Sequence, residues 1–291
     1  MEYFYLVASV FLIASDSIFG SCYNRKNEGR RSPTQLFNLL LITAALVGWS
    51  LLYAFDFSFN LASLPYAFLF AVGHAVVDIG FILALATGPV ALTALILQIS
   101  LIGVTVWGFI FWGEEPTVLT FIGLVLVVIS IALCLTSPTK DGSDKKPITL
   151  KWILFAAMVF VGNVTCSVSQ RTHQIVFDGK HGNMMMAFSM LMLFIFFLVT
   201  YLFSDRSDSR KIVRESWHFP IASGACNVLL NFLVILLAVT EIPPSLIYPV
   251  ISVGGIMITS LFSAFFLKEK LYFWQWCGIA VGAVAIAVLS V

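Results

Sequence analysis

Ten long hydrophobic runs, separated by short polar stretches, make up most of the chain. Each run has about 20 residues, the length at which an α-helix crosses the hydrocarbon core of a bilayer. Lipid offers no hydrogen-bond partner to the backbone, so runs of this length are expected to be helices. The predicted spans are Tyr3–Cys22, Thr34–Ala54, Leu64–Ala86, Pro89–Trp112, Thr117–Thr136, Leu150–Thr172, Asn183–Ser204, Trp217–Ala238, Pro244–Phe266 and Tyr272–Val291.

The layout of the first half of the chain recurs in the second half at a distance of 155 residues. In each copy a proline opens an apolar run, a short acidic turn follows, and a second apolar run carries glycine in its first turns. A repeat of this kind indicates two copies of one structural unit. The matching residues are Pro89 and Pro244, Phe111 and Phe266, Glu114 and Glu269, Gly123 and Gly278, and the pairs Ile131-Ala132 and Ile286-Ala287.

A polar segment, Ser137–Pro147, lies near the midpoint and is the expected boundary between the copies. We therefore expect a first repeat over residues 1–136, a linker over 137–147 and a second repeat over 148–291. Five spans per repeat is an odd number, so equivalent residues enter the membrane from opposite faces. The predicted fold is an all-α membrane protein with ten transmembrane helices in a 5+5 inverted repeat, a transporter architecture with its substrate site near the midplane.

Composition supports a multi-pass membrane protein. The chain has 60% hydrophobic residues, 11% charged residues and a mean hydropathy of +0.99, whereas a soluble domain has about 25% charged residues. The net charge of +1 offers no basic face, so no nucleic-acid partner is expected. The five cysteines lack CxxC spacing and no GxxxxGK[ST] sequence occurs. We therefore predict no metal site, no cofactor and no ATP hydrolysis.

The loop charges predict an orientation. Of the 16 Lys and Arg residues, 14 lie in or beside the loops after the first, fifth, seventh and ninth spans. The positive-inside rule places these loops in the cytoplasm and both termini outside.

Residues at the ends of the spans predict local roles. Glu114 and Glu269 each stand just before a helix and are expected to cap its N-terminus. Trp112, Trp152 and Trp217 fit the aromatic belts at the membrane interfaces.

Three segments of the second half resemble a known family. They are Pro244–Val250 (PSLIYPV), Lys268–Leu271 (KEKL) and Gln275–Gly278 (QWCG), and they are similar to the second EamA domain of the drug/metabolite transporter superfamily. The first half carries a weaker copy, Gly113–Thr117 (GEEPT) followed by Gly123. The resemblance implies ten helices and alternating access for small metabolites, and we expect the inner or plasma membrane of a bacterial cell. It does not supply a substrate, since relatives carry amino acids, nucleotide sugars, phosphorylated sugars and other solutes.

Acidic residues inside the spans are the first candidates for a substrate site, because charge at membrane depth is costly. Asp16 and Asp78 are predicted at similar depth in spans 1 and 3, and His74 lies four residues before Asp78 on the same helix face. This set is suited to carrying a proton or binding a cationic group. Alternatively it is a structural hydrogen-bond set, and Ser15, Ser17 and Ser21 are near enough to satisfy Asp16 locally.

The second group of candidates is neutral. Amides and hydroxyls of this kind suit a zwitterion or a polyol, and the alternative role is bonding between helices, worth about 0.6 kcal/mol per pair on average. Near the outer end of span 6, Arg171 either captures an anion or extends to the interface, with Gln170 and His173 beside it. The neutral candidates for substrate binding are Gln98, Asn163, Asn227, Asn231, Tyr248 and Ser252.

The predicted function is secondary transport of a small polar metabolite, with an amino acid or a related compound favoured and proton coupling open. The first alternative is a carrier of sugars or of phosphorylated or nucleotide-linked metabolites, which would need more cationic groups at depth. The second is a receptor without transport activity, or an intramembrane enzyme, although no catalytic residue is predicted. The expected partners are the lipid bilayer and the small-molecule substrate; we expect a monomer and leave an oligomer open.

Overall fold

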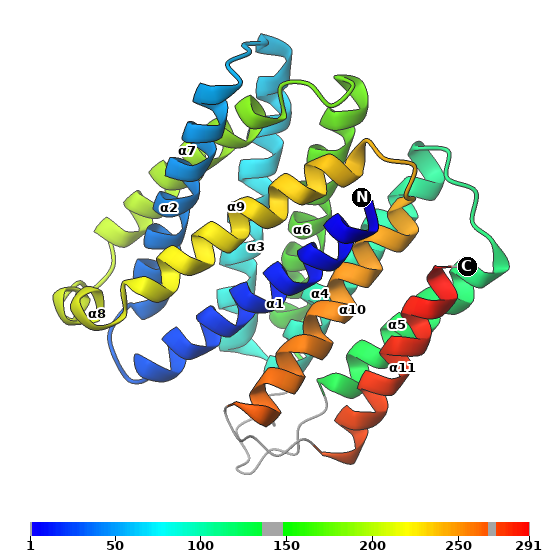
Figure 1. Cartoon of the computed structure of the whole chain (residues 1–291). Helices are drawn as coiled ribbons and strands as arrows, with labels where there is room; N and C mark the ends of the chain where they lie inside the picture. The colour runs from blue at the N-terminus through cyan, green and yellow to red at the C-terminus, as the bar shows by residue number, and fades with distance from the viewer. Residues whose placement is uncertain (1, 136–147, 267–271, 291) are drawn as a thin grey trace. The chain divides into compact units, whose positions relative to one another are not determined.

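The computed structural model describes residues 2–135, 148–266 and 272–290, and these residues form helices and connections without a strand (Figure 1). The predicted linker, Ser137–Pro147, lies outside the described residues. Glu269, with the neighbouring Lys268 and Lys270, lies outside them as well. The helices are α1 (Glu2–Lys26), α2 (Pro33–Phe55), the 3-10 helix η1 (Leu61–Ser63), α3 (Leu64–Thr87), α4 (Val90–Phe111), α5 (Val118–Cys134), α6 (Leu150–Val176), α7 (Gly182–Leu202), α8 (Ser209–Ser216), α9 (His218–Ala238), α10 (Pro244–Phe265) and α11 (Phe273–Leu289).

Eight of the predicted spans are confirmed as helices that are long and apolar enough to cross a membrane. The ends predicted for the ten apolar runs differ from the helix ends by at most four residues. The fifth and tenth predicted spans are apolar helices of only 17 residues, α5 and α11. Each is about 26 Å long at 1.5 Å per residue, slightly less than the thickness of a typical hydrocarbon core.

The described helices form two compact units, and each unit takes helices from both halves of the sequence. Unit 1 comprises residues 3–71 and 169–239, which hold α1, α2, the start of α3, the end of α6, and α7 to α9. Unit 2 comprises the described residues of 72–168 and 240–290, which hold the rest of α3 and α6 with α4, α5, α10 and α11. The division by contacts therefore differs from the division into sequence repeats.

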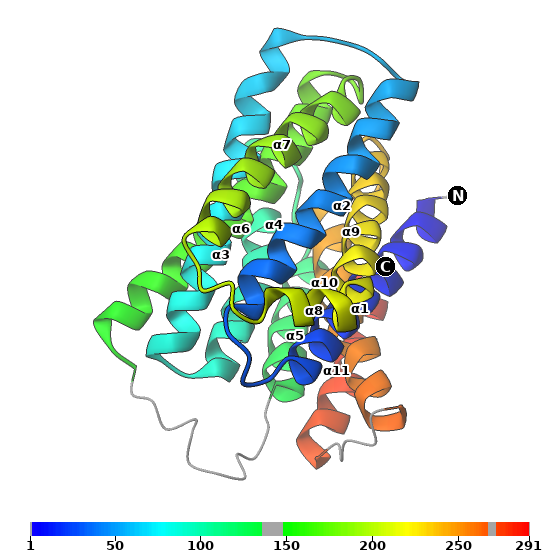
Figure 2. The same ribbon diagram turned by 90° about the vertical axis from the view of Figure 1, so that its left-hand side faces the viewer.

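In unit 1, α2 packs between α7 and α9 (Figure 2). The contact with α9 is close because Gly224 lies against the α2 backbone, where an added Cβ would be 2.5 Å from the carbonyl oxygen of Leu41. Small residues permit such approaches between membrane helices.

The hydrophobic pattern did not predict the short α-helix α8. Its sequence, SRKIVRES, is mostly polar, and it lies in unit 1 between α7 and α9. Its apolar face is anchored by Ile212, which is buried against Tyr23 and Leu36. An amphipathic helix of this kind is typical of the membrane surface rather than of a span.

Ion pairs fasten α8 and the residues before it to the connection between α1 and α2. Arg30 donates to Glu215 at 2.5 Å and Arg31 donates to Asp205 at 2.6 Å. The Arg31 hydrogen bond lowers the pKa of Asp205 to about 2, and the same pair raises the pKa of Arg31. The hydrogen bond from Arg30 likewise lowers the pKa of Glu215. Both carboxylates are therefore ionised and engaged at neutral pH.

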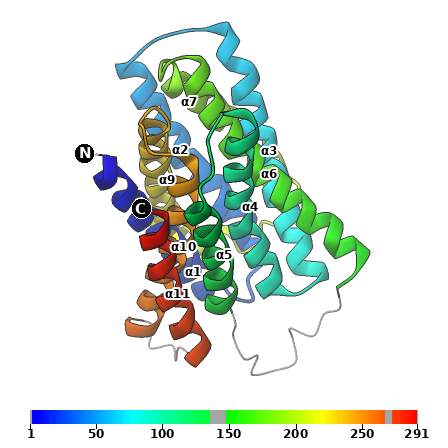
Figure 3. The same cartoon turned by 90° about the vertical axis from the view of Figure 1, so that its right-hand side faces the viewer.

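In unit 2, α5 packs along α11, and α10 packs against α4, α5 and α11 (Figure 3). The contact between α3 and α6 is built on glycine, because a Cβ at Gly162 would lie 2.7 Å from the carbonyl oxygen of Gly73. The prediction for Trp152 was wrong: this residue is buried rather than at an interface, and its indole N–H donates to Thr93 Oγ1 at 3.0 Å. A position near a span end does not reveal which side of the helix faces protein.

Gly162→Ala is expected to destabilise the protein by about 1–3 kcal/mol, because the added methyl meets backbone that cannot move aside. The matched control is Gly20→Ala on α1, where the added Cβ would make an ordinary contact at 3.9 Å. Thermal unfolding in detergent measures both, and equal midpoints for the two variants would contradict the close approach of α3 and α6.

Candidate functional site

A stripe of polar side chains runs along α9 in unit 1. Ser223, Asn227 and Asn231 follow one another at intervals of four residues and so share one helix face. The Asn231 side-chain amide donates to the Asn227 backbone oxygen at 2.9 Å and to its side-chain oxygen at 3.1 Å. The stripe covers about 12 Å of the helix axis. Asn227 and Asn231, both predicted to bind substrate, are therefore bonded to each other on one helix face.

Side chains from two other helices join the ends of this stripe. At one end the Ser223 hydroxyl donates to the Asp16 carboxylate on α1. At the other end the Gln170 amide on α6 donates to the Asn231 side-chain oxygen at 3.2 Å. Gln170 is only 3% exposed. Three helices of unit 1 thus contribute to one polar track.

The expectation that neighbouring serines satisfy Asp16 is not met. The hydroxyls of Ser15, Ser17 and Ser21 each donate to the backbone oxygen four residues earlier in α1. This is the common back-bonding of serine inside a helix. The Asp16 carboxylate instead accepts a hydrogen bond from Ser223 of α9, a residue that was not predicted from the sequence.

Further polar residues of α6 are buried towards its end. His173 is fully buried, with Nε2 3.0 Å from Ser63 Oγ and Nδ1 3.0 Å from the Gln174 amide nitrogen. Since an amide nitrogen can only donate, Nδ1 accepts and the proton of the neutral imidazole lies on Nε2. Arg171 is 7% exposed, so it is packed within protein and does not extend to the interface.

In unit 2, the predicted pairing of His74 with Asp78 on α3 is confirmed. His74 Nδ1 lies 3.1 Å from Asp78 Oδ2, and both side chains are about three-quarters buried. The joint set with Asp16 remains a prediction, since Asp16 belongs to unit 1.

Helix α4 connects the other polar candidates of unit 2. Ser252 on α10 donates to Gln98 Oε1 at 3.1 Å. Asn163 on α6 donates to Ser100 Oγ at 2.6 Å. Tyr248 is 4% exposed and precedes Ser252 by one turn of α10. Ser100 was not predicted, because a single serine in an apolar run gives no signal in the sequence.

Glu114 caps a helix, as predicted, but not the helix that follows it. The N-cap of α5 is Thr117, which exchanges bonds with Thr120 in a capping box. Glu114 Oε1 instead accepts from the backbone N–H, at 3.1 Å, and from the hydroxyl of Ser245 in the first turn of α10. The carboxylate thereby satisfies a donor that α10 itself leaves open. The equivalent role of Glu269 lies outside the described residues.

Glu114→Ala is expected to lower stability by about 1 kcal/mol through the loss of this cap, whereas Glu114→Gln keeps an acceptor and loses less. The matched control is Glu115→Ala, which removes the same charge from an exposed neighbour. Denaturation in detergent compares the three variants, and the capping role fails if Glu114→Ala and Glu115→Ala are equally stable.

The second half of the chain matches a known family. Residues 150–291 match the model of the EamA-like transporter family. No curated protein matches the chain. A protein of solved crystal structure superposes with a TM-score of 0.74, over 99% of this chain and 95% of that chain, at 11% sequence identity. At that identity the likeness shows the fold alone. Residues 150–291 thus form an EamA-like domain, a domain of the drug/metabolite transporter superfamily, and the apolar helices of the chain make it a multi-pass membrane protein.

Proposed function

We propose that this protein is a secondary transporter that moves a small polar metabolite by alternating access. Its EamA domain supports transport in general. The observation that carries the proposal is the polar track of unit 1, Asp16–Ser223–Asn227–Asn231–Gln170, which lies on helices of spanning length. Polar groups inside a membrane are costly and typically mark a substrate or ion pathway.

The proposed architecture is ten spans in two inverted repeats, residues 1–136 and 148–291, with α5 and α11 as the fifth and tenth spans. Helices of 17 residues span a bilayer by local thinning at a modest cost. In an inverted repeat, equivalent helices of the two halves are exchanged across a pseudo-two-fold axis. The composition of the two units, each drawn from both halves, supports this arrangement. We further propose that both termini lie outside, because most Lys and Arg residues lie in or beside the loops of the opposite face. The proposed membrane is that of a bacterial cell.

The favoured substrate is an amino acid or a related zwitterion. Unit 1 offers an acid, Asp16, for an ammonium group and amides for polar atoms. Among the described residues Arg171 is the only Lys or Arg that is buried. One guanidinium suits one carboxylate, whereas a phosphorylated sugar or a nucleotide is usually held by several cationic groups. The residues proposed to bind substrate are Asp16, His74, Asp78, Gln98, Asn163, Asn227, Asn231, Tyr248 and Ser252.

Asn227→Ala and Asn231→Ala are expected to reduce uptake at least about tenfold while changing stability by only about 0.6 kcal/mol, since interhelical bonds in membranes are weak. Uptake is measured in proteoliposomes against a panel of radiolabelled amino acids, sugars and nucleotides. The control is Asn183→Ala, which removes an amide at the start of α7 that contacts Asp56 at 3.4 Å.

Failure to accumulate any solute of the panel would refute transport of these metabolites. Variants that lose stability yet keep full uptake would assign the asparagines to packing alone.

Proton coupling is proposed through Asp16 or the His74–Asp78 pair. Where the carboxyl carries the proton, Asp16→Asn or Asp78→Asn is expected to abolish uptake driven by a pH gradient and to leave counterflow exchange intact, because the neutral amide cannot release a proton. Loss of both uptake and exchange would instead assign that carboxyl to substrate binding. Uptake and exchange are measured in the same proteoliposomes. If both variants keep the full response to the pH gradient, transport is facilitated diffusion.

A further inference from the structure

Unit 1 has an apolar groove between α2 and α9, with a volume of about 550 Å³. Small residues are among those that line it, including Ala44 and Gly48 on α2 and Ala225 on α9. Val47 and Leu229 line it and remain 56% and 53% exposed, so the groove is open on its outer side. In a membrane-spanning segment the molecules available to enter an apolar groove of this kind are lipids.

The groove runs along the helices. Gly224 lies against Leu41 and Ala44, and Gly48 lies against Val228, so α2 and α9 run side by side in the same direction. The α9 residues that line it extend from Ile221 to Leu229 on one face. This is about 12 Å along the axis, and the shape suits one extended hydrocarbon chain. The groove begins one turn after Trp217, which stands between α8 and α9.

The same end of unit 1 carries an excess of positive charge. Residues 25–31 and 205–215 contain eight Lys and Arg against four Asp and Glu. Two of the acids, Asp205 and Glu215, are paired with Arg31 and Arg30. Arg210, Lys211 and Arg214 of α8 are exposed. The result is a basic, amphipathic surface helix, the sequence type that binds anionic membrane surfaces.

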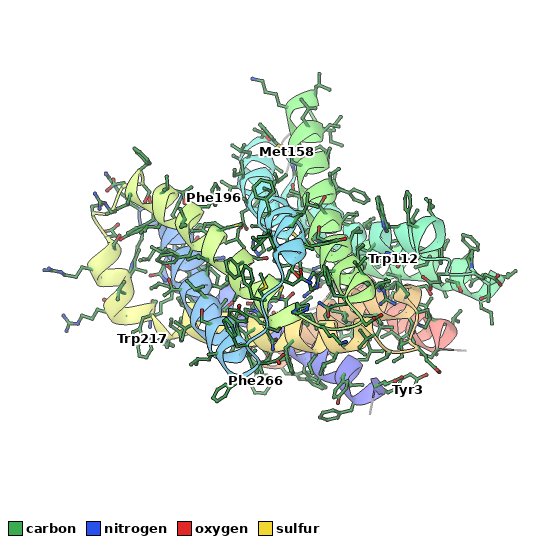
Figure 4. All side chains as sticks on the ribbon, turned by 90° about the horizontal axis from the view of Figure 1, so that it is seen from above. Tyr3, Trp112, Met158, Phe196, Trp217 and Phe266 are labelled. Carbon is green, nitrogen blue, oxygen red and sulfur yellow. The ribbon has the colours of Figure 1, made fainter. Side chains whose placement is uncertain are left out.

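Lys26 contacts both α8 and the first turn of α9, close to the start of the groove. Its ammonium group donates to the Glu215 backbone oxygen at 2.6 Å and lies 5.7 Å from the centre of the Phe219 ring. Phe219 precedes Ile221, the first groove residue of α9, by two positions. Trp217 is 53% exposed at this end, where Figure 4 shows nitrogen-tipped side chains extending outward. A tryptophan in this position is typical of the level of the lipid headgroups.

We propose that this end of unit 1 binds one anionic phospholipid of the bilayer, with an acyl chain in the α2–α9 groove and the phosphate at Lys26, Lys211 and Arg214. The groove adds little affinity of its own, because an acyl chain leaves an equally apolar environment when it enters. It fixes the position of the lipid instead. The choice among lipids comes from charge, at about 1 kcal/mol for each basic residue near the phosphate.

The test is native mass spectrometry of the delipidated full-length protein in detergent, titrated with phosphatidylglycerol or with phosphatidylcholine of the same acyl chains. Phosphatidylglycerol is expected to bind more tightly. The double variant Lys211→Gln/Arg214→Gln is expected to weaken its binding about 25-fold, or about fivefold per charge removed. Lys180→Gln, an exposed lysine at the other end of α7, is the control and is expected to bind as the parent does.

A second pair of variants tests the groove. Ala225→Phe fills the groove, so the lipid no longer sits with its phosphate at the basic residues, and the preference for phosphatidylglycerol over phosphatidylcholine is expected to fall. Val284→Phe, at an exposed position of α11, is expected to leave this preference unchanged. Equal binding of the two lipids by the parent protein would overturn the proposal, as would full retention in the double variant. Displacement of the lipid by inorganic phosphate at equal concentration would assign the basic end to free anions. If the variants fail to fold, the salt dependence of the parent protein tests the proposal. Its preference for phosphatidylglycerol over phosphatidylcholine must weaken between low and high salt, because salt screens the attraction between the basic residues and the phosphate.

Discussion

The constraint on which this structure depends is the absence of water around its backbone. In the hydrocarbon core an unpaired N–H or C=O costs several kcal/mol, so each segment must satisfy its own backbone by forming a helix. The same constraint acts at the helix ends, where the first donors have no partner within the helix. Thr117 meets it for α5 through a local capping box, and Glu114 meets it for α10 from a distant part of the sequence. These polar side chains thus lie where a backbone N–H at a helix start requires an acceptor.

Polar side chains within the helices obey the same rule, and they connect helices in doing so. Each unit has its own network: Asp16, Ser223, Asn231 and Gln170 in unit 1, and Gln98, Ser252, Asn163 and Ser100 in unit 2. In both networks a residue of one helix bonds a residue that lies far away in the sequence. Such pairs give specific contacts where the hydrophobic effect between helices is absent. Under the proposed transport function, a substrate that entered either network would have to compete with these bonds.

The spans could be predicted because length and hydropathy alone define them, and the contacts within one helix could be predicted because a four-residue spacing fixes a face. His74 with Asp78 and Asn227 with Asn231 are examples. Contacts between helices could not be predicted, since they depend on which face of each helix meets its neighbour. Ser223 and Ser100 were missed for that reason, and Trp152 was assigned to the wrong environment. Helix α8 was missed because an eight-residue polar segment has no spanning pattern.

The Glu114–Ser245 contact also joins the connection between α4 and α5 to the start of α10. Gly108 leaves room beside the carboxylate, and the contact joins residues 131 positions apart in the sequence. The start of α10 therefore has a tether that is independent of the peptide chain. Any displacement of the start of α10 away from the α4–α5 connection must therefore first break this contact. Such a displacement would also leave the Ser245 backbone N–H without its acceptor.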